Sequence, residues 1–162
     1  MDLAYCDKWS ATKKKPWTVI DIDKAQNNHI NNIPYTAIVQ KNGNVKSVVE
    51  IADKYITVAF MNEKMSPYLF YNFDIKDSSN IFLSSAYYYS YDEKGDDELE
   101  LVAFRFTENG HIIMERRNYI TGDVEEKYLN GDVGPNWDKF PEFGEYEHLL
   151  REEREVVIVS DV

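Results

Sequence analysis

The sequence predicts a mainly β fold, in which an antiparallel meander forms a strongly twisted sheet, a half-barrel or a closed barrel, with one C-terminal α-helix. Apolar and polar residues alternate with a period of two up to about residue 130, as in strands with one buried face. Turn sequences such as Asn42-Gly43 and Asn109-Gly110 separate the alternating segments. Asn-Gly is a strong hairpin signal, because both residues tolerate a positive φ angle. Successive strands joined by short turns form a meander.

The first segment with strand character is residues 17–23, and we expect the Asn-rich residues 24–32 after it to form a loop. Residues 55–61 are apolar on both faces, which is typical of a central strand. About eight strands of this kind curl into a twisted sheet, a half-barrel or a barrel. The expected strands after the loop are residues 33–39, 45–51, 55–61, 68–75, 81–91, 99–106, 111–117 and 124–129.

The pattern changes near residue 134. Residues 134–141 are irregular and aromatic, which suits a segment that packs its rings across the sheet. Residues 142–154 are expected to form the C-terminal helix, and residues 155–160 a final strand. We therefore expect a single domain over residues 1–162, with its strand-rich part at residues 16–129. The helix prediction depends on apolar residues at helical spacing: Phe143, Tyr146, Leu149 and Leu150.

The net charge of −11 is unevenly distributed, because residues 81–162 hold 20 of the 29 acidic side chains and 8 of the 18 basic ones. Such a charge repels phosphate backbones and argues against nucleic-acid binding. No apolar run approaches the roughly 20 residues that cross a bilayer, and no signal peptide is visible. The single cysteine, Cys6, excludes an internal disulfide and a cysteine-based zinc site. We therefore expect a cytoplasmic protein without nucleic-acid or membrane partners.

Catalytic motifs are absent from the sequence. His29, His111 and His148 lie in no recognisable catalytic pattern, and the glycines stand singly, so no phosphate-binding loop is present. The acidic stretch at residues 92–97 does not match the ligand spacing of a calcium loop. We expect no enzymatic activity, no catalytic residues, no metal site and no cofactor.

The acidic excess is the most informative remaining feature. It serves solubility alone, or it attracts a basic protein and raises the rate of association. Exposed tyrosines are typical of protein interfaces, although those at residues 87–91 are equally suited to a core or a ligand cavity. The candidate partner-binding residues are Asp92, Glu93, Asp96, Asp97, Glu98, Glu100, Asp123, Glu125, Glu126, Tyr89 and Tyr91.

Residues 104–128 and 137–143 give the chain its resemblance to a known class. They contain Phe104-Arg105-Phe106, Arg116-Arg117-Asn118-Tyr119 and the aromatic tail Trp137 to Phe143. In this, and in its small acidic tyrosine-rich β character, the chain resembles the immunity proteins of bacterial polymorphic toxin and contact-dependent growth inhibition systems. The resemblance implies tight binding to a cognate toxin, often a nuclease, whose active site or substrate groove is covered.

Two further hypotheses remain open at this point. A β-barrel with a cavity lined by Tyr and Phe would bind a small apolar or aromatic ligand. An enzyme would need His111 or paired carboxylates in a pocket with perturbed pKa values. The leading hypothesis is an immunity protein that neutralises a basic toxin domain through its acidic turns and the tyrosines near them.

Overall fold

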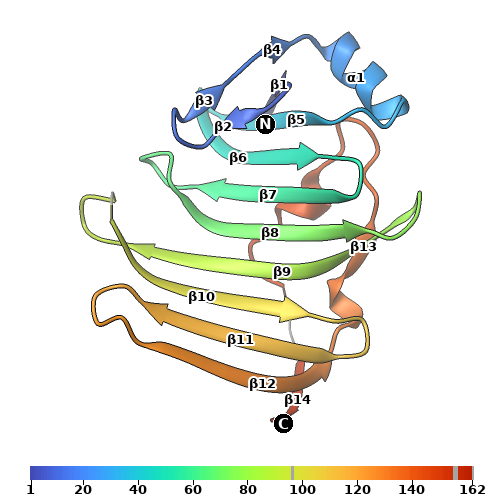
Figure 1. The fold of residues 1–162 in the computed structure, drawn as a ribbon. Coiled ribbons are helices and arrows are strands. Elements are labelled where there is room, and N and C mark those ends of the chain that lie inside the picture. The colour runs from blue at the N-terminus through green and yellow to red at the C-terminus, as the bar shows by residue number, and fades with distance from the viewer. Residues whose placement is uncertain (96, 155–156, 162) are drawn as a thin grey trace.

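The computed structural model describes residues 1–95, 97–154 and 157–161, and it confirms a mainly β, antiparallel fold (Figure 1). In this part of the chain, the main sheet has 12 strands in the order β14-β12-β11-β10-β9-β8-β7-β6-β5-β1-β4, and β13 pairs with β9. The strands are β1 Asp2–Cys6, β2 Trp9–Ser10, β3 Lys15–Pro16, β4 Val19–Ile20, β5 Tyr35–Lys41, β6 Asn44–Ile51, β7 Tyr55–Met61, β8 Pro67–Ile75, β9 Asn80–Tyr91, β10 Glu98–Phe106, β11 His111–Asn118, β12 Val124–Asp132, β13 Trp137–Lys139 and β14 Val157–Asp161. The helices are α1 Ile22–Ile30 and two short 3₁₀ helices, Gly134–Asn136 and Glu147–Leu150.

The expected meander is present from β5 to β12, where each strand pairs with the next one along the chain. Its turns alternate between two ends of the sheet (Figure 1). The β9–β10 and β11–β12 turns lie at one end, and the β6–β7 and β8–β9 turns lie at the other. We call the end that carries the β9–β10 turn (residues 92–97) and the β11–β12 turn (residues 119–123) the acidic end.

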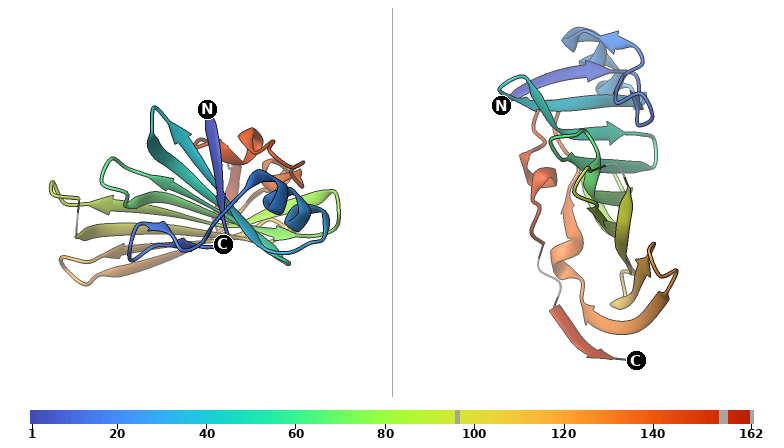
Figure 2. Two further views of the ribbon diagram at one scale, coloured as in Figure 1. Left: turned by 90° about the horizontal axis from the view of Figure 1, so that it is seen from above. Right: turned by 90° about the vertical axis from the view of Figure 1, so that its left-hand side faces the viewer.

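The sheet is strongly curved but not closed into a barrel, since its terminal strands β14 and β4 stand at opposite ends of the strand order (Figure 2). Register shifts interrupt the β5–β6, β7–β8 and β8–β9 ladders, and bulges of this kind bend strands and increase their twist. One shift lies between Phe60 and Met61, where Met61 pairs with Pro67, a residue without a backbone N–H to donate.

The core lies between the concave face of the sheet and the segment of residues 133–154, which we call the strap (Figure 2). The strap contributes Tyr146 and Leu149, which are 2% and 0% exposed, and these pack with Tyr35, Tyr71 and Phe73 of the sheet. The hydroxyl of Tyr71 also donates a hydrogen bond to the strap, where it lies 2.9 Å from the backbone oxygen atoms of both Arg151 and Glu152. The strap therefore supplies the second layer that a lone curved sheet lacks.

The prediction of an α-helix at residues 142–154 is wrong, because this part of the strap contains only the 3₁₀ helix Glu147–Leu150. Gly144 has a φ of +83°, which interrupts a right-handed helix. The apolar side chains at helical spacing instead anchor an irregular segment to the sheet. The prediction of no regular structure in residues 134–141 also fails in part, because β13 pairs with β9.

The prediction of a loop at residues 24–32 is also wrong, since α1 occupies Ile22–Ile30. Asp21 caps this helix by accepting a hydrogen bond from the backbone N–H of Lys24 at 2.8 Å. Ala25 and Asn28, one turn apart, form its buried side. The residues expected to form a first strand at 17–23 form only the short strand β4.

The expected final strand at residues 155–160 corresponds to β14, Val157–Asp161, while residues 155 and 156 lie outside the described residues. None of the helices that the structure describes has both the length and the apolar character needed to span a bilayer.

Candidate functional site

The acidic end brings together the carboxylate-rich β9–β10 turn and the β11–β12 turn, where Asp123 precedes Glu125 and Glu126 of β12. The β9–β10 turn is closed by hydrogen bonds from Asp92 N–H to Asp97 O and from Gly95 N–H to Asp92 O, both 2.9 Å. Gly95 has a φ of +75°, which an L-residue with a side chain rarely adopts. Tyr119 N–H donates to Leu99 O at 3.0 Å, which ties the β11–β12 turn to β10. Asp96 lies outside the described residues.

The strand register divides the predicted partner-binding residues between the two faces of the sheet. Tyr89 pairs with Leu101 of β10, on the convex face, and Glu98 pairs with Tyr91. A bulge at Leu99 then places Glu100 opposite Ser90, on the concave face. The convex face holds Tyr89, Tyr91, Glu98 and Glu126, the concave face holds Glu100 and Glu125, and the turns hold Asp92, Glu93, Asp97 and Asp123.

The concave carboxylates already have basic neighbours. Glu100 Oε1 lies 3.1 Å from Nε of Arg116, and both side chains are more than one third exposed. Glu125 pairs in register with the same Arg116. Their negative charge is therefore partly compensated within the sheet.

The convex face near the acidic end is aromatic and partly exposed. Tyr119 and Tyr128 are 46% and 52% exposed, and Val124 is 53% exposed. Burial and the neighbouring Glu98 raise the pKa of Tyr91 to about 12, and the same causes raise the pKa of Tyr89. Both hydroxyls therefore stay protonated at neutral pH. The hydroxyl of Tyr91 already donates to the backbone oxygen of Pro67 at 2.5 Å, whereas the hydroxyl of Tyr89 can donate a hydrogen bond to a partner.

A buried carboxylate organises two arginines on this face. Glu115, only 7% exposed, accepts hydrogen bonds from Nη2 of Arg105 at 3.2 Å and from Nε of Arg117 at 2.6 Å. The side chains of Arg105 and Arg117 are about half exposed, and each guanidinium has further N–H donors besides the one bonded to Glu115. The hydrogen bond and the charge of Glu115 raise the pKa of Arg117, which keeps this guanidinium positively charged.

Sequence reasoning missed this three-residue group. Period-two alternation places Glu115 and Arg117 on one face, which was a usable signal. The position of Arg105 beside them depends on the register of β10 against β11, where Arg105 pairs with Ile113 and Ala103 with Glu115. That register is not readable from the alternation alone.

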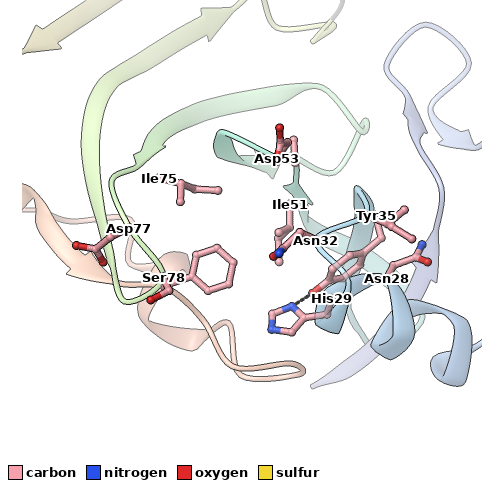
Figure 3. A pocket seen from close by; sticks show the side chains of 12 residues that line it. Asn28, His29, Asn32, Tyr35, Ile51, Asp53, Ile75, Asp77 and Ser78 are labelled. Carbon is pink, nitrogen blue, oxygen red and sulfur yellow. Dashed lines mark hydrogen bonds between the residues drawn. The ribbon is translucent and has the colours of Figure 1, made fainter.

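A cavity of about 320 Å³ lies near the other end of the sheet, between α1, the β6–β7 and β8–β9 turns and the strap (Figure 3). Ile51, Ile75 and Phe140 form apolar walls, and His29 and Tyr35 provide polar atoms. The cavity does not lie inside a barrel, and sequence reasoning did not identify it. Its full lining is Asn28, His29, Asn32, Ile33, Tyr35, Ile51, Ala52, Asp53, Ile75, Asp77, Ser78 and Phe140.

A chain of hydrogen bonds runs from this cavity into the core. Nδ1 of His29 lies 2.8 Å from the hydroxyl of Tyr35, which lies 2.9 Å from the hydroxyl of Tyr146 (Figure 3 shows the first of these). Burial lowers the pKa of His29 and raises the pKa of both tyrosines. All three groups are therefore neutral at pH 7, and the chain joins α1, β5 and the strap.

The other histidines lie elsewhere and make hydrogen bonds of their own. Nδ1 of His111 lies 3.0 Å from Oδ1 of Asn130, and Nε2 of His148 lies 2.9 Å from the backbone oxygen of Lys139. Across the described ranges, no three His, Cys, Asp or Glu side chains are grouped as a metal site requires. Comparison of the chain with family models, curated proteins and solved structures finds no match.

Proposed function

We propose that this chain is a cytoplasmic, non-enzymatic immunity protein, which binds a basic toxin domain and covers its active site or substrate groove. The observation that carries the proposal is the acidic end, where the carboxylate-rich β9–β10 turn and the acidic start of β12 border a partly exposed aromatic face of the same strands. Interfaces commonly have an aromatic and arginine-rich centre with a polar rim, and charge complementarity guides association.

The charge at this end favours a basic partner. Among the described residues from 92 to 127 there are ten carboxylates and five basic side chains, and Lys64 of the β7–β8 turn packs against Gly95. This excess makes the local potential negative at neutral pH. A positively charged nuclease domain, whose groove holds a phosphate backbone, has the complementary charge.

The centre of the proposed contact is the convex face around the Glu115 group. Arg105 and Arg117 are held in place before binding, so little of their side-chain entropy is lost on association. Tyrosine and arginine are the residue types most often found at interface hot spots. We therefore expect Tyr89, Arg117 and Tyr128 to contribute more to affinity than the turn carboxylates, which act mainly on the association rate.

The decisive experiment is a rescue assay. The C-terminal domain of the protein encoded immediately upstream is expressed with and without this chain, and growth is followed. Growth arrest that this chain relieves, together with co-purification of the two proteins, supports the proposal. A harmless neighbour, or arrest that the chain does not relieve, contradicts it.

The role of the acidic end is tested by charge reversal with a matched control. In the double variant Asp97→Lys/Glu98→Lys we expect association with the toxin domain to slow by roughly tenfold or more at low salt. The control Glu142→Lys/Glu145→Lys makes the same change in net charge on the exposed surface of the strap. Equal association rates for the two variants would show that net charge, and not this end of the sheet, attracts the toxin.

A small-molecule binder remains the second candidate, and the cavity beside His29 is the observation that favours it. The cavity has the size of small ligand sites and combines apolar walls with a few polar groups. A ligand that binds only the folded state raises the melting temperature with concentration. A thermal-shift screen in which His29→Ala abolishes a hit supports this function, and a screen without hits contradicts it.

A further inference from the structure

We propose that the free outer edge of β12, residues 124–128, pairs with an extended basic segment of the toxin, which adds a strand to the sheet. The inference rests on the proposed function and specifies how the partner is held. Strand addition at an open edge provides affinity through backbone hydrogen bonds and specificity through alternate side chains.

The edge is open along half of β12. β14 pairs with Leu129 to Asp132, and no described strand pairs with the outer side of Val124 to Tyr128. All five residues of this segment are exposed, so β11 alone holds them in the sheet. The backbone groups on the outer side of the segment are therefore available to another chain.

Two hydrogen bonds at the ends of the β11–β12 ladder show which residues of β12 point their backbone N–H and C=O groups toward β11 and which point them outward. Asn118 N–H donates to Asp123 O at 2.9 Å at the turn, and Gly131 N–H donates to Gly110 O at 2.9 Å near the other end. Because hydrogen-bonded pairs alternate in an antiparallel ladder, odd-numbered residues of β12 face β11. Val124, Glu126 and Tyr128 therefore direct their N–H and C=O groups outward.

The outward positions of this edge hold one charged side chain, Glu126, between two strand-favouring ones, and Glu125 and Lys127 lie between them. Protein edges are usually blocked by charged side chains, proline or very short strands. The opposite edge of this sheet is the two-residue strand β4, which follows that rule. On β12, however, two of the three outward positions hold Val124 and Tyr128, which are 53% and 52% exposed. Both side chains favour strands and both lie on the convex aromatic face.

Charge selects the occupant of this edge. Glu126 lies opposite Glu115 on β11, which is already paired with two arginines, and the carboxylate of Glu126 accepts a hydrogen bond from the hydroxyl of Tyr128 at 3.1 Å. A lysine or arginine of an incoming strand, placed beside Glu126, neutralises it. A second copy of this chain, paired antiparallel about the centre of the edge, would place Glu126 next to Glu126. A basic segment of the toxin is therefore favoured over self-association.

Two substitutions at one position separate the backbone from the side chain. Glu126→Pro removes the outward N–H and leaves the ladder to β11 intact, since proline is tolerated at edges where its nitrogen faces solvent. Glu126→Gln removes the charge and keeps the N–H. In a titration with the upstream toxin domain, we expect Glu126→Pro to weaken binding by roughly tenfold or more, and Glu126→Gln by clearly less.

Amide hydrogen exchange of the wild-type chain gives a readout that does not depend on the variant folding. In the complex we expect exchange at Val124, Glu126 and Tyr128 to slow by about tenfold or more, with smaller changes at Glu125 and Lys127, which already bond to β11. Binding without this protection, and with equal affinity for Glu126→Pro and Glu126→Gln, overturns the edge inference and leaves the proposed function standing. A wild-type chain that neither binds nor rescues overturns both.

Discussion

The hydroxyl of Tyr35, on β5, lies 2.9 Å from the hydroxyl of Tyr146, 111 residues later in the strap. Both residues are buried, and Tyr35 also bonds to Nδ1 of His29. The two hydroxyls fix where the strap crosses the concave face of the sheet. Since the strap is the layer that closes the core, this contact connects local hydrogen bonding to the stability of the whole fold.

The two tyrosines are expected to differ in their effect on stability. Tyr35→Phe leaves both His29 and Tyr146 without their shared partner, so it should lower the free energy of unfolding by roughly 1–3 kcal/mol. Tyr146→Phe leaves the bond between Tyr35 and His29 intact and removes the interactions of its own hydroxyl with Tyr35 and Tyr5, so it should cost about 0.5–1.5 kcal/mol. Urea unfolding measures both. The exposed Tyr128→Phe is the control and should change stability by less than either, whereas equal losses at Tyr35 and Tyr146 would contradict the shared-partner role.

Stability should fall in mild acid because of His29. Burial lowers the pKa of His29 in the folded state below the ordinary value of about 6.5, so the unfolded chain binds more protons in this range. The free energy of unfolding therefore decreases as the pH falls through 6.5 toward the folded pKa. Tyr35 bonds to the ring, and Asp53 and Asp77 line the same cavity.

The measurement is urea unfolding between about pH 7 and pH 5. His29→Gln should flatten the dependence in this window, while His111→Gln, which changes an exposed histidine, should keep it. The same slope in His29→Gln as in the wild type would assign the acid sensitivity to other groups.

Arg154 is a buried cation. We expect its truncation to alanine to lower the stability of the fold, and its replacement by an apolar side chain of similar length to have a smaller effect. Its side chain is 4% exposed, lies 5.3 Å and 5.0 Å from the ring centroids of Tyr71 and Phe73, and pairs with Asp138 at 3.4 Å. Within the described residues, its Nε has no hydrogen-bond partner. Arg154→Ala opens a cavity over the rings and should cost about 3 kcal/mol, near the lower limit for breaking a buried pair.

Arg154→Met should recover most of that loss, because methionine fills the space and Asp138 keeps its bond to Arg151 at 2.9 Å. The control Arg151→Ala removes an exposed partner of the same carboxylate and should cost less than about 1 kcal/mol. Thermal or urea unfolding of the three variants measures these losses of stability. A methionine variant as unstable as the alanine variant would mean that the charge, and not the packing, holds the strap here.

The meander could be predicted from the sequence because its signals are local. Most strands from β5 to β12 alternate, β7 being apolar on both faces, and five of the seven turns that join them carry Gly or Asn. The β6–β7 and β8–β9 turns carry Asp53 and Asp77 instead. The irregular conformation of the strap could not be predicted in this way. Tyr146 and Leu149 have helical spacing, but the residues that they pack against lie on distant strands. Apolar residues that repeat every 3.6 positions indicate that one side of a segment is buried, but they do not show that the segment is a helix. Asp21, which caps α1, could have indicated the helix, but the Asn-rich composition of residues 24–32 favoured the prediction of a loop.

The candidate site could be predicted only in part, for a similar reason. Composition alone indicated the acidic turns, and antiparallel pairing of neighbouring strands brings them to one end. The division between faces depends on a bulge at Leu99, which moves Glu98 and Glu100 to opposite sides. The Glu115 group depends on register across two ladders. Neither a bulge nor a register is encoded in residue types at fixed spacing.

Glu115 provides a test that joins the stability of the sheet to the proposed interface. Glu115→Gln keeps the shape of the side chain but removes the charge that holds Arg105 and Arg117, and it should lower the free energy of unfolding by roughly 1–3 kcal/mol. The matched control is Glu100→Gln, which changes the exposed pair with Arg116 and should cost less than about 1 kcal/mol.

In binding, Glu115→Gln should raise the dissociation rate from the toxin domain more than it lowers the association rate, since it disorders side chains at the centre of the contact without altering the acidic turns. Surface plasmon resonance separates the two rates, and the unfolding measurement on the free protein shows that the variant is folded. Unchanged dissociation in a variant that has lost stability would place the Glu115 group outside the interface, and the contact would then lie on the turns or on the concave face.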